Sequence, residues 1–481
     1  MTNIKSLIND VFIYGIANAF SKMISLILLP IMVHFLNQTE YGLSDGINVF
    51  ISLLLPLIIF GQDSSVARYS IEVKNEEEKK QMISQSFFFQ LLLGLLLIVF
   101  LFLFADEIGN FFLNSIEAPR FIKLSAWIIL FQFINQFACN LLKWHFQRIR
   151  FLILSVCMPI SITIVTIILL KFSDLGLISI FYSQIIVGAF FSIVGLYFVK
   201  PFLTIPDNFK WLPNLIKFGW PYFVIMFLPM VLPSIDRFLI THLMSLKYLA
   251  VYALAFRLAS IIYFPIYGFQ TAWGPFALRV YKEGNHKILY NLVLKSYILV
   301  LLIVIILIAI FIKPLVSLLS NSDYSGAKYL VVPIMLAVFF ESISLVTGMG
   351  IDISKKSYLS AIAYLAGIII GGLFTWILTL KFQLVGLVYG GMFGKLLFTI
   401  IKSYLSDVVT PLPFEYKKIV PFVFLGILFC LFLNYTLTEM IYLKILLGLL
   451  MIGSLILTFW FWLLNQENKE AVLVFTKRYV K

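Results

Sequence analysis

Three basic residues stand deep inside long apolar stretches of this sequence: Lys22, Arg257 and Lys395. Lys22 lies in the middle of the apolar run 11–33, so its Cα would be about 16 Å from either end of a helix built from that run. A lysine side chain cannot reach the membrane surface from there, so it must face protein or a water-filled cavity. Asn18 falls on the same helical face as Lys22. Ammonium and guanidinium groups bind phosphate and pyrophosphate oxygens, so these cations predict a cavity for an anionic substrate.

Glu341 is an acidic residue at the centre of another apolar stretch. Two interpretations stay open: it binds a coupling proton or Na⁺, or it forms an internal salt bridge with Lys395 or Arg257. The other candidate partner for a deep cation is Asp63. Two acids cannot neutralise three deep cations, which leaves positive charge for a substrate.

Amide and aromatic side chains form a second group of candidate residues. They stand at helical spacing inside apolar stretches and comprise Gln132, Gln136, Gln270 and Trp273. Such side chains contact sugar hydroxyls and rings, but they also form hydrogen bonds between membrane helices, and both interpretations stay open. Asp236 and Arg237 are neighbours near the outer end of an apolar stretch, where they are structural or line the rim of a cavity.

These residues must be positioned by membrane helices, because the composition excludes other classes. Of 481 residues, 61% are hydrophobic and 12% are charged, against about 45–50% and 25% in soluble globular proteins. This excludes a soluble enzyme, a disordered chain and a fibrous protein, and it predicts an all-α polytopic membrane protein. The fourteen stretches long enough to cross a membrane are 11–36, 44–66, 83–105, 120–142, 149–170, 175–199, 214–240, 246–274, 288–312, 327–350, 357–380, 384–407, 416–438 and 441–464.

Basic residues predict the orientation of these spans. With the N-terminus in the cytoplasm, 24 of the 36 Lys and Arg residues fall in cytoplasmic segments and 8 in segments on the opposite side. We therefore expect both termini in the cytoplasm, and the net charge of +13 indicates topology rather than nucleic-acid binding. The sequence contains no G-x-x-x-x-G-K-[ST] motif and no histidine pair at metal spacing, so we expect no cofactor and no metal.

A weak internal repeat divides the chain. Tyr41 and Arg68 recur as Tyr252 and Arg279, each at an offset of 211 residues. Six spans precede the central connector and six follow it, so the halves share one orientation and a site is expected between them. The predicted parts are two six-helix lobes around a central cavity and a final pair of helices with a cytoplasmic tail: 1–206, 207–408 and 409–481.

Four segments resemble the polysaccharide-transporter family, the lipid-linked oligosaccharide or O-antigen flippases, whose superfamily also contains multidrug extruders. The segments run from Leu29-Pro30 to Glu40-Tyr41-Gly42, then Ser234-Ile235-Asp236-Arg237-Phe238, then Tyr252-Ala253-Leu254-Ala255-Phe256-Arg257, and then Gln270-Thr271-Ala272-Trp273-Gly274-Pro275-Phe276. The resemblance covers essentially the whole chain in span number and orientation.

The resemblance implies a transporter, not an enzyme, that moves undecaprenyl-pyrophosphate-linked sugar units across the bacterial cytoplasmic membrane by alternating access. Lys22, Arg257 and Lys395 would then receive the pyrophosphate. Implied partners are the lipid-linked oligosaccharide, membrane lipids, coupling H⁺ or Na⁺, and polysaccharide polymerase and chain-length proteins.

Three other functions stay open. A flippase for a peptidoglycan lipid precursor would suit the same cavity. A cation-coupled multidrug extruder fits the superfamily, although surplus cavity cations argue against cationic drugs. A membrane enzyme such as a glycan polymerase would ordinarily have a large outer loop, and the longest predicted connectors hold only 14 residues.

Overall fold

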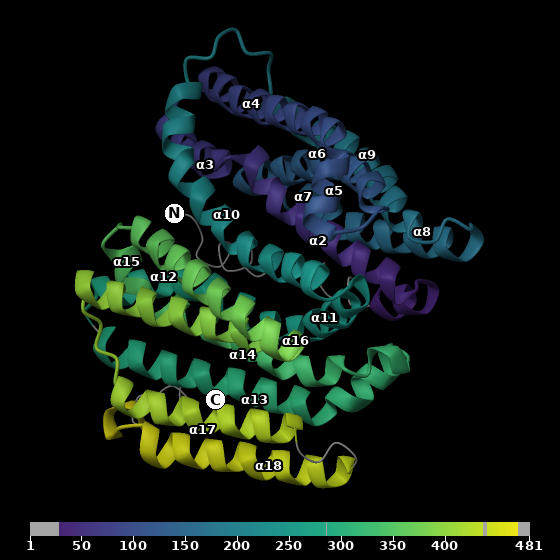
Figure 1. The fold of residues 1–481 in the computed structure, drawn as a ribbon. Coiled ribbons are helices and arrows are strands. Elements are labelled where there is room, and N and C mark those ends of the chain that lie inside the picture. Colours follow the sequence, from purple (N-terminus) through teal and green to yellow (C-terminus); the bar gives the residue numbers. More distant parts are fainter. Residues whose placement is uncertain (1–27, 285, 436–439, 470–481) are drawn as a thin grey trace. The chain divides into compact units, whose positions relative to one another are not determined.

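The computed structural model describes residues 28–284, 286–435 and 440–469, and within these ranges the chain is helical without strands (Figure 1). Twelve of the described helical segments are long and apolar enough to cross a membrane. One of them, α16 (Tyr358–Val409), has 52 residues and divides into two helices at Gln383, whose φ of 51° and ψ of −133° are non-helical. The described residues therefore hold thirteen crossing segments, which correspond to the second to fourteenth predicted spans. The predicted all-α membrane fold is confirmed.

The first predicted span, 11–36, lies mostly outside the described residues. Its last part, residues 28–35, is helical. Because Lys22 and Asn18 lie in the earlier part, their predicted roles have no structural description here.

The chain forms two compact units, Met1–Ala253 and Leu254–Lys481, called unit 1 and unit 2 below. The helices of unit 1 are α2 (Gln38–Ile59), α3 (Gln62–Glu72), α4 (Glu76–Leu103), α5 (Ala105–Leu113), α6 (Ala118–Trp144), α7 (Arg148–Leu152), α8 (Met158–Phe172), α9 (Ile178–Val199) and α10 (Leu212–Leu243). The helix α11 (Leu246–Ala259) crosses the boundary. Unit 2 also contains α12 (Tyr263–Lys282), α13 (His286–Leu319), α14 (Ala327–Thr347), α15 (Met349–Ile353), α16, α17 (Tyr416–Tyr435) and α18 (Ile441–Thr458).

The boundary between the two units lies after Ala253, whereas the predicted boundary between the two lobes lies after residue 206. The helix α10 packs against α2, α3 and α5, so its contacts group it with unit 1. The sequence repeat instead assigns α10 to the second lobe. The lobes 1–206, 207–408 and 409–481 describe the repeat and stay a prediction.

Capping side chains mark the start of two helices in unit 1, and a left-handed turn separates two others. Asn37 and Glu40 form a reciprocal capping box at the start of α2, each side chain accepting from the other's backbone N–H at 2.9 Å. The side chain of Asn75 caps α4, whose first turn is acidic and so complements the helix dipole. Between α2 and α3, Phe60 and Gly61 have φ of 47° and 67°. A Cβ on Gly61 would collide with the carbonyl oxygen of Gly219, so this turn lets α10 approach closely.

Two helices of unit 1 stand out: α6, which packs against four others, and α10, which is the longest and is bent. The helix α6 packs against α2, α4, α5 and α9. The helix α10 contains Pro221, Pro229 and Pro233, and it changes direction along its length (Figure 1). Proline removes a backbone donor and clashes with the preceding turn, which accounts for the bend.

In unit 2, α14 packs against α13, α16 and α17, while α18 packs against α13 and α17. A polar cluster at the start of α17 and beyond the end of α18 connects these two helices to α13. The ammonium of Lys295 on α13, fully buried, lies 3.3 Å from Glu415 Oε2, which precedes α17. Asn465 Nδ2, beyond α18, donates to Glu415 Oε1 at 2.8 Å.

The structure adds a third element to the sequence repeat. Arg68 pairs with Glu72 at 2.8 Å, and Arg279 pairs with Glu283 at 2.9 Å. Both pairs join residues four apart at the end of a helix, and the offset of 211 residues relates Glu72 to Glu283 as well. The repeat therefore extends to a local ion pair.

The two halves of α16 pack against each other through glycines. A Cβ on Gly371 would lie 2.5 Å from the Cα of Gly394, whereas a Cβ on Gly372 would meet nothing within 4 Å. Small residues allow this close backbone approach, which is a common packing device in membranes.

We predict opposite effects for two neighbouring glycines in this hairpin. Gly371→Ala should destabilise the protein by about 1–3 kcal/mol, because the added methyl group meets backbone. Gly372→Ala should be neutral or slightly stabilising, because alanine is the better helix former. The measurement is the melting midpoint of the purified protein in detergent, and equal midpoints for the two variants would contradict the hairpin packing.

Candidate functional site

A line of polar contacts joins α14 to the second half of α16 within unit 2. We call it the polar seam, and it consists of Glu341, Ser344 and Thr347 on α14 and Lys395, Thr399, Lys402 and Ser403 on α16. Thr399 Oγ1 donates to the carbonyl oxygen of Phe340 at 2.7 Å, and Ser403 Oγ donates to Thr347 Oγ1 at 2.6 Å. The spacing of Lys395, Thr399 and Lys402 places them on one face of α16, and α14 lies against that face.

The centre of the polar seam is an ion pair. Lys395 Nζ lies 2.8 Å from Glu341 Oε2, and the hydroxyl of Tyr364 donates to Glu341 Oε1 at 3.0 Å. Each charged residue stands about 18–21 Å from the ends of its span at 1.5 Å per residue. The pair is therefore near the middle of both spans, and of the two interpretations of Glu341 this conformation contains the internal salt bridge.

The ion pair is not sealed. The side chains of Lys395 and Glu341 are 17% and 23% exposed, although α14 as a whole is largely buried. Exposure of charge to hydrocarbon is costly, so the exposed side of this pair has to face protein or water rather than lipid.

A second cation extends the seam toward one end of α16. Lys402 Nζ donates to Ser344 Oγ at 3.5 Å, with Asp352 and Glu341 as its acidic neighbours. Its aliphatic chain passes over Gly348, where a Cβ would lie 2.6 Å from Lys402 Cε. These contacts make Lys402 a member of the polar seam.

Arg257 is half-buried in α11, beside a break in the helix. A 3-10 turn, Ser260–Ile262, separates α11 from α12, and Ser260 Oγ donates to the carbonyl oxygen of Arg257 at 2.6 Å. Tyr263, which follows the break, is an electrostatic neighbour of Glu341. Short 3-10 segments inside a span often mark a hinge.

The amide candidates of α6 are partly engaged in helix packing. Asn140 Nδ2 donates to Asp63 Oδ2 at 2.7 Å, and the side chain of Gln136 also bonds to that carboxyl. Lys143 donates to Asn140 at 3.3 Å. Asp63 therefore has its partners on α6, within unit 1, while Gln132 is half-buried on the same helix.

Gln270 and Trp273 have different surroundings although they share a motif. Gln270 is exposed, whereas Trp273 is 4% exposed and donates its indole N–H to the carbonyl oxygen of Leu345 at 3.0 Å. Its ring stacks on Phe269 at a centroid distance of 5.6 Å. In this conformation Trp273 fixes α12 to α14, and its ring is not accessible to a sugar.

Asp236 and Arg237 belong to a buried cluster in unit 1. The guanidinium of Arg237, 1% exposed, donates from Nε to Asp45 Oδ2 at 3.0 Å and lies 4.8 Å from the ring centroid of Tyr252. The hydroxyl of Tyr252 donates to Asp236 Oδ2 at 2.8 Å. Of the two sequence interpretations, this geometry fits the structural one, because the cluster ties α2, α10 and α11 together.

Two residues of these contacts, Asp45 and Tyr364, are absent from the sequence-predicted site. Asp45 stands at the very start of the predicted span 44–66, and only the earlier start of α2 at Gln38 places it inside a helix. Nothing in the sequence distinguishes Tyr364 from the other tyrosines of the chain, because its role depends on how the first half of α16 lies against α14.

Comparison with known proteins identifies the family. A family model described as polysaccharide biosynthesis protein matches residues 31–327, more than half of the chain. A Haemophilus influenzae protein described as an uncharacterized membrane protein is 24% identical over 386 residues, covering 76% of this chain and 90% of that protein.

Solved structures share the fold at low sequence identity. The lipid II flippase MurJ in an inward closed conformation has a TM-score of 0.73 at 17% identity, covering 92% of this chain and 98% of that one. An inward-facing MATE multidrug resistance transporter has a TM-score of 0.59 at 17% identity, with 80% and 97% covered. A MOP superfamily transporter from Pyrococcus furiosus has a TM-score of 0.61 at 17% identity, with 83% and 95% covered.

The architecture is thus that of a multi-pass membrane protein with the MurJ and MATE fold. The chain belongs to the polysaccharide biosynthesis protein family, and the resemblance to polysaccharide transporters seen in the sequence is confirmed.

We predict that the Arg237 cluster supports folding. Asp45→Asn should destabilise the protein by about 3–5 kcal/mol, because it leaves a buried guanidinium without its counter-charge. The matched control is Glu72→Gln, which breaks a pair whose side chains are 60% and 49% exposed and should cost less than about 1 kcal/mol. Melting midpoints in detergent compare the two, and an equal loss would contradict the structural role.

Proposed function

We propose that this protein is a flippase that moves undecaprenyl-pyrophosphate-linked oligosaccharide repeat units across the bacterial cytoplasmic membrane for surface polysaccharide biosynthesis. Membership in the polysaccharide biosynthesis family supports the pathway. The fold shared with MurJ and MATE transporters supports movement of a substrate across the bilayer. The observation that carries the proposal is the partly exposed Lys395–Glu341 pair near the middle of two membrane spans.

The proposed mechanism is an exchange of partners at Lys395. Pyrophosphate carries more negative charge than a carboxylate, so it competes with Glu341 for the ammonium. The released carboxylate keeps the hydroxyl of Tyr364 as a donor, and Lys402 offers a second cation 3.5 Å from Ser344. A substrate that neutralises Lys395 thereby changes the contact between α14 and α16, which provides a link between binding and helix movement.

Other residues complete the proposed site. Lys22, with Asn18 on its helical face, and Arg257 supply further positive charge. Gln132, Gln136 and Gln270 are the proposed sugar contacts, with Gln270 the most accessible of them. The sequence has no nucleotide-binding motif, so an ion gradient, the membrane potential or mass action drives the cycle.

The proposed setting follows from the basic-residue bias. Both termini lie in the cytoplasm, and the substrate enters from the side rich in Lys and Arg. Coupling H⁺ or Na⁺ and the polymerase and chain-length proteins are the proposed partners.

The first test is deletion of the gene in its host. We expect loss of surface polysaccharide and accumulation of lipid-linked intermediates inside, measured by glycan staining and by lipid extraction with mass spectrometry. Intact surface polysaccharide together with blocked peptidoglycan synthesis would instead indicate the peptidoglycan-precursor flippase. Loss of drug resistance alone would indicate the extruder.

The second test separates substrate binding from folding at the ion pair. Lys395→Gln should lower transport in proteoliposomes by about 10–100-fold, the value of one lost charge-assisted contact. In the double variant Lys395→Glu with Glu341→Lys, the ion pair is restored with its charges exchanged. We expect its melting midpoint to recover while transport stays low.

Recovery of both transport and melting midpoint in the exchanged pair would contradict the anion-binding role, because the pair would then be structural. Lys22→Ala and Arg257→Ala should also lower transport without removing the protein from the membrane. The control is Arg68→Ala, which changes an exposed ion pair outside the proposed site.

A further inference from the structure

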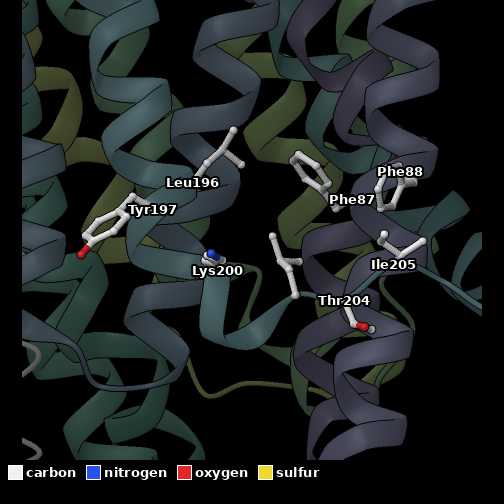
Figure 2. A pocket seen from close by; sticks show the side chains of 8 residues that line it. Phe87, Phe88, Leu196, Tyr197, Lys200, Thr204 and Ile205 are labelled. Carbon is white, nitrogen blue, oxygen red and sulfur yellow. The ribbon is translucent and has the colours of Figure 1, made fainter.

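A groove of about 420 Å³ runs between α4 and α9 in unit 1. Both helices pack against α6, and the residues that line the groove come from α4, α9 and the connector that follows α9. Figure 2 shows Phe87 and Phe88 on one side of the groove and Leu196 and Tyr197 on the other, with Lys200 near its end. The volume is in the range of small-molecule sites in proteins.

The body of the groove is suited to hydrocarbon. Phe87 is buried and its ring packs on those of Phe133 and Phe137 of α6, with centroids 5.9 and 4.9 Å apart. Phe88 and Tyr197 are exposed on the walls. In a membrane-spanning chain, an exposed apolar wall contacts acyl chains rather than water.

The connector between α9 and α10 closes one end of the groove. It is fixed to α4 by three backbone donors: the N–H of Thr204 donates to Ser84 Oγ at 2.8 Å, that of Asp207 to Gln81 Oε1 at 3.1 Å, and that of Trp211 to Gln85 Oε1 at 2.9 Å. The closed end is therefore preformed, and it lies at the ends of α4 and α9 on the side that the basic residues mark as cytoplasmic.

One basic side chain, that of Lys200, lines the closed end. Lys200 is exposed there. Among the described residues of unit 1, the ion pairs are those of Arg68 with Glu72, Lys79 with Glu76 and Arg237 with Asp45, so none of them includes Lys200. Arg150 lies 5.5 Å from the ring centroid of Phe198, two residues before Lys200. An apolar groove that ends at a cation complements one kind of molecule, a hydrocarbon chain that carries an anionic head group.

We propose that this groove is a binding site for an anionic phospholipid of the cytoplasmic leaflet, with one acyl chain between α4 and α9 and the phosphate at Lys200. The bound lipid stabilises the connector that joins α9 to α10. A resident phospholipid fits better than the polyprenyl tail of the substrate, because that tail must follow its head group across the bilayer and the groove is closed at one end.

The test is photolabelling in phosphatidylcholine liposomes that contain a trace of phosphatidylglycerol with a diazirine in its acyl chain. We expect adducts on peptides that contain Phe88, Leu196 or Tyr197, about fivefold above those from phosphatidylcholine with the same labelled chain. Lys200→Gln should reduce the phosphatidylglycerol adducts to the phosphatidylcholine level. The matched control, Lys210→Gln, changes an exposed lysine of the same connector outside the groove and should leave them unchanged.

A second variant tests the groove itself. Leu196→Trp fills the apolar part and should lower labelling by both lipids, with circular dichroism and the melting midpoint as checks on folding. Equal labelling by the two lipids, or equal effects of Lys200→Gln and Lys210→Gln, would overturn the proposal. So would displacement of the label by unlabelled polyprenyl phosphate but not by unlabelled phosphatidylglycerol, since the groove would then hold the substrate tail.

Discussion

A charge placed in the hydrocarbon layer needs an opposite charge or water, and this requirement organises both units of the protein. In unit 1 the guanidinium of Arg237 is paired with Asp45, which joins α10 to α2. In unit 2 the ammonium of Lys395 is paired with Glu341, which joins α16 to α14. Each pair specifies which two helices must lie side by side, because neither partner is stable in lipid without the other.

Both pairs are salt bridges, but they differ in how far their side chains are exposed, and we assign them different roles. Arg237 is sealed among Asp45, Asp236 and Tyr252, so exchanging its partner would require the cluster to open. Lys395 and Glu341 are partly exposed, which is the property that the proposed exchange with a competing anion requires. Burial favours a fixed joint in unit 1, and partial exposure favours an exchangeable contact in unit 2.

The segments by which the family is recognised are mainly architectural. Gly42 lies against the carbonyl oxygen of Leu246, and Arg237 and Tyr252 meet in the buried cluster, so three of these segments converge in unit 1. Trp273 from the fourth fixes α12 to α14. These contacts are structural, whereas the ion pair that carries the proposed chemistry, Lys395 with Glu341, lies outside the four segments. Arg257 and Gln270 are the members of the proposed site that lie within them.

The sequence by itself determined the membrane class and the order and approximate position of the spans, because a helix in lipid satisfies its own backbone and its hydropathy is a local property. It also nominated Lys395 and Glu341, since a deep charge is visible without any contact. The tertiary structure decided what these residues touch. The pairing of Asp45 with Arg237, the packing role of Trp273 and the groove beside Lys200 join residues distant in the chain. Such contacts depend on how the helices pack, which no local pattern records.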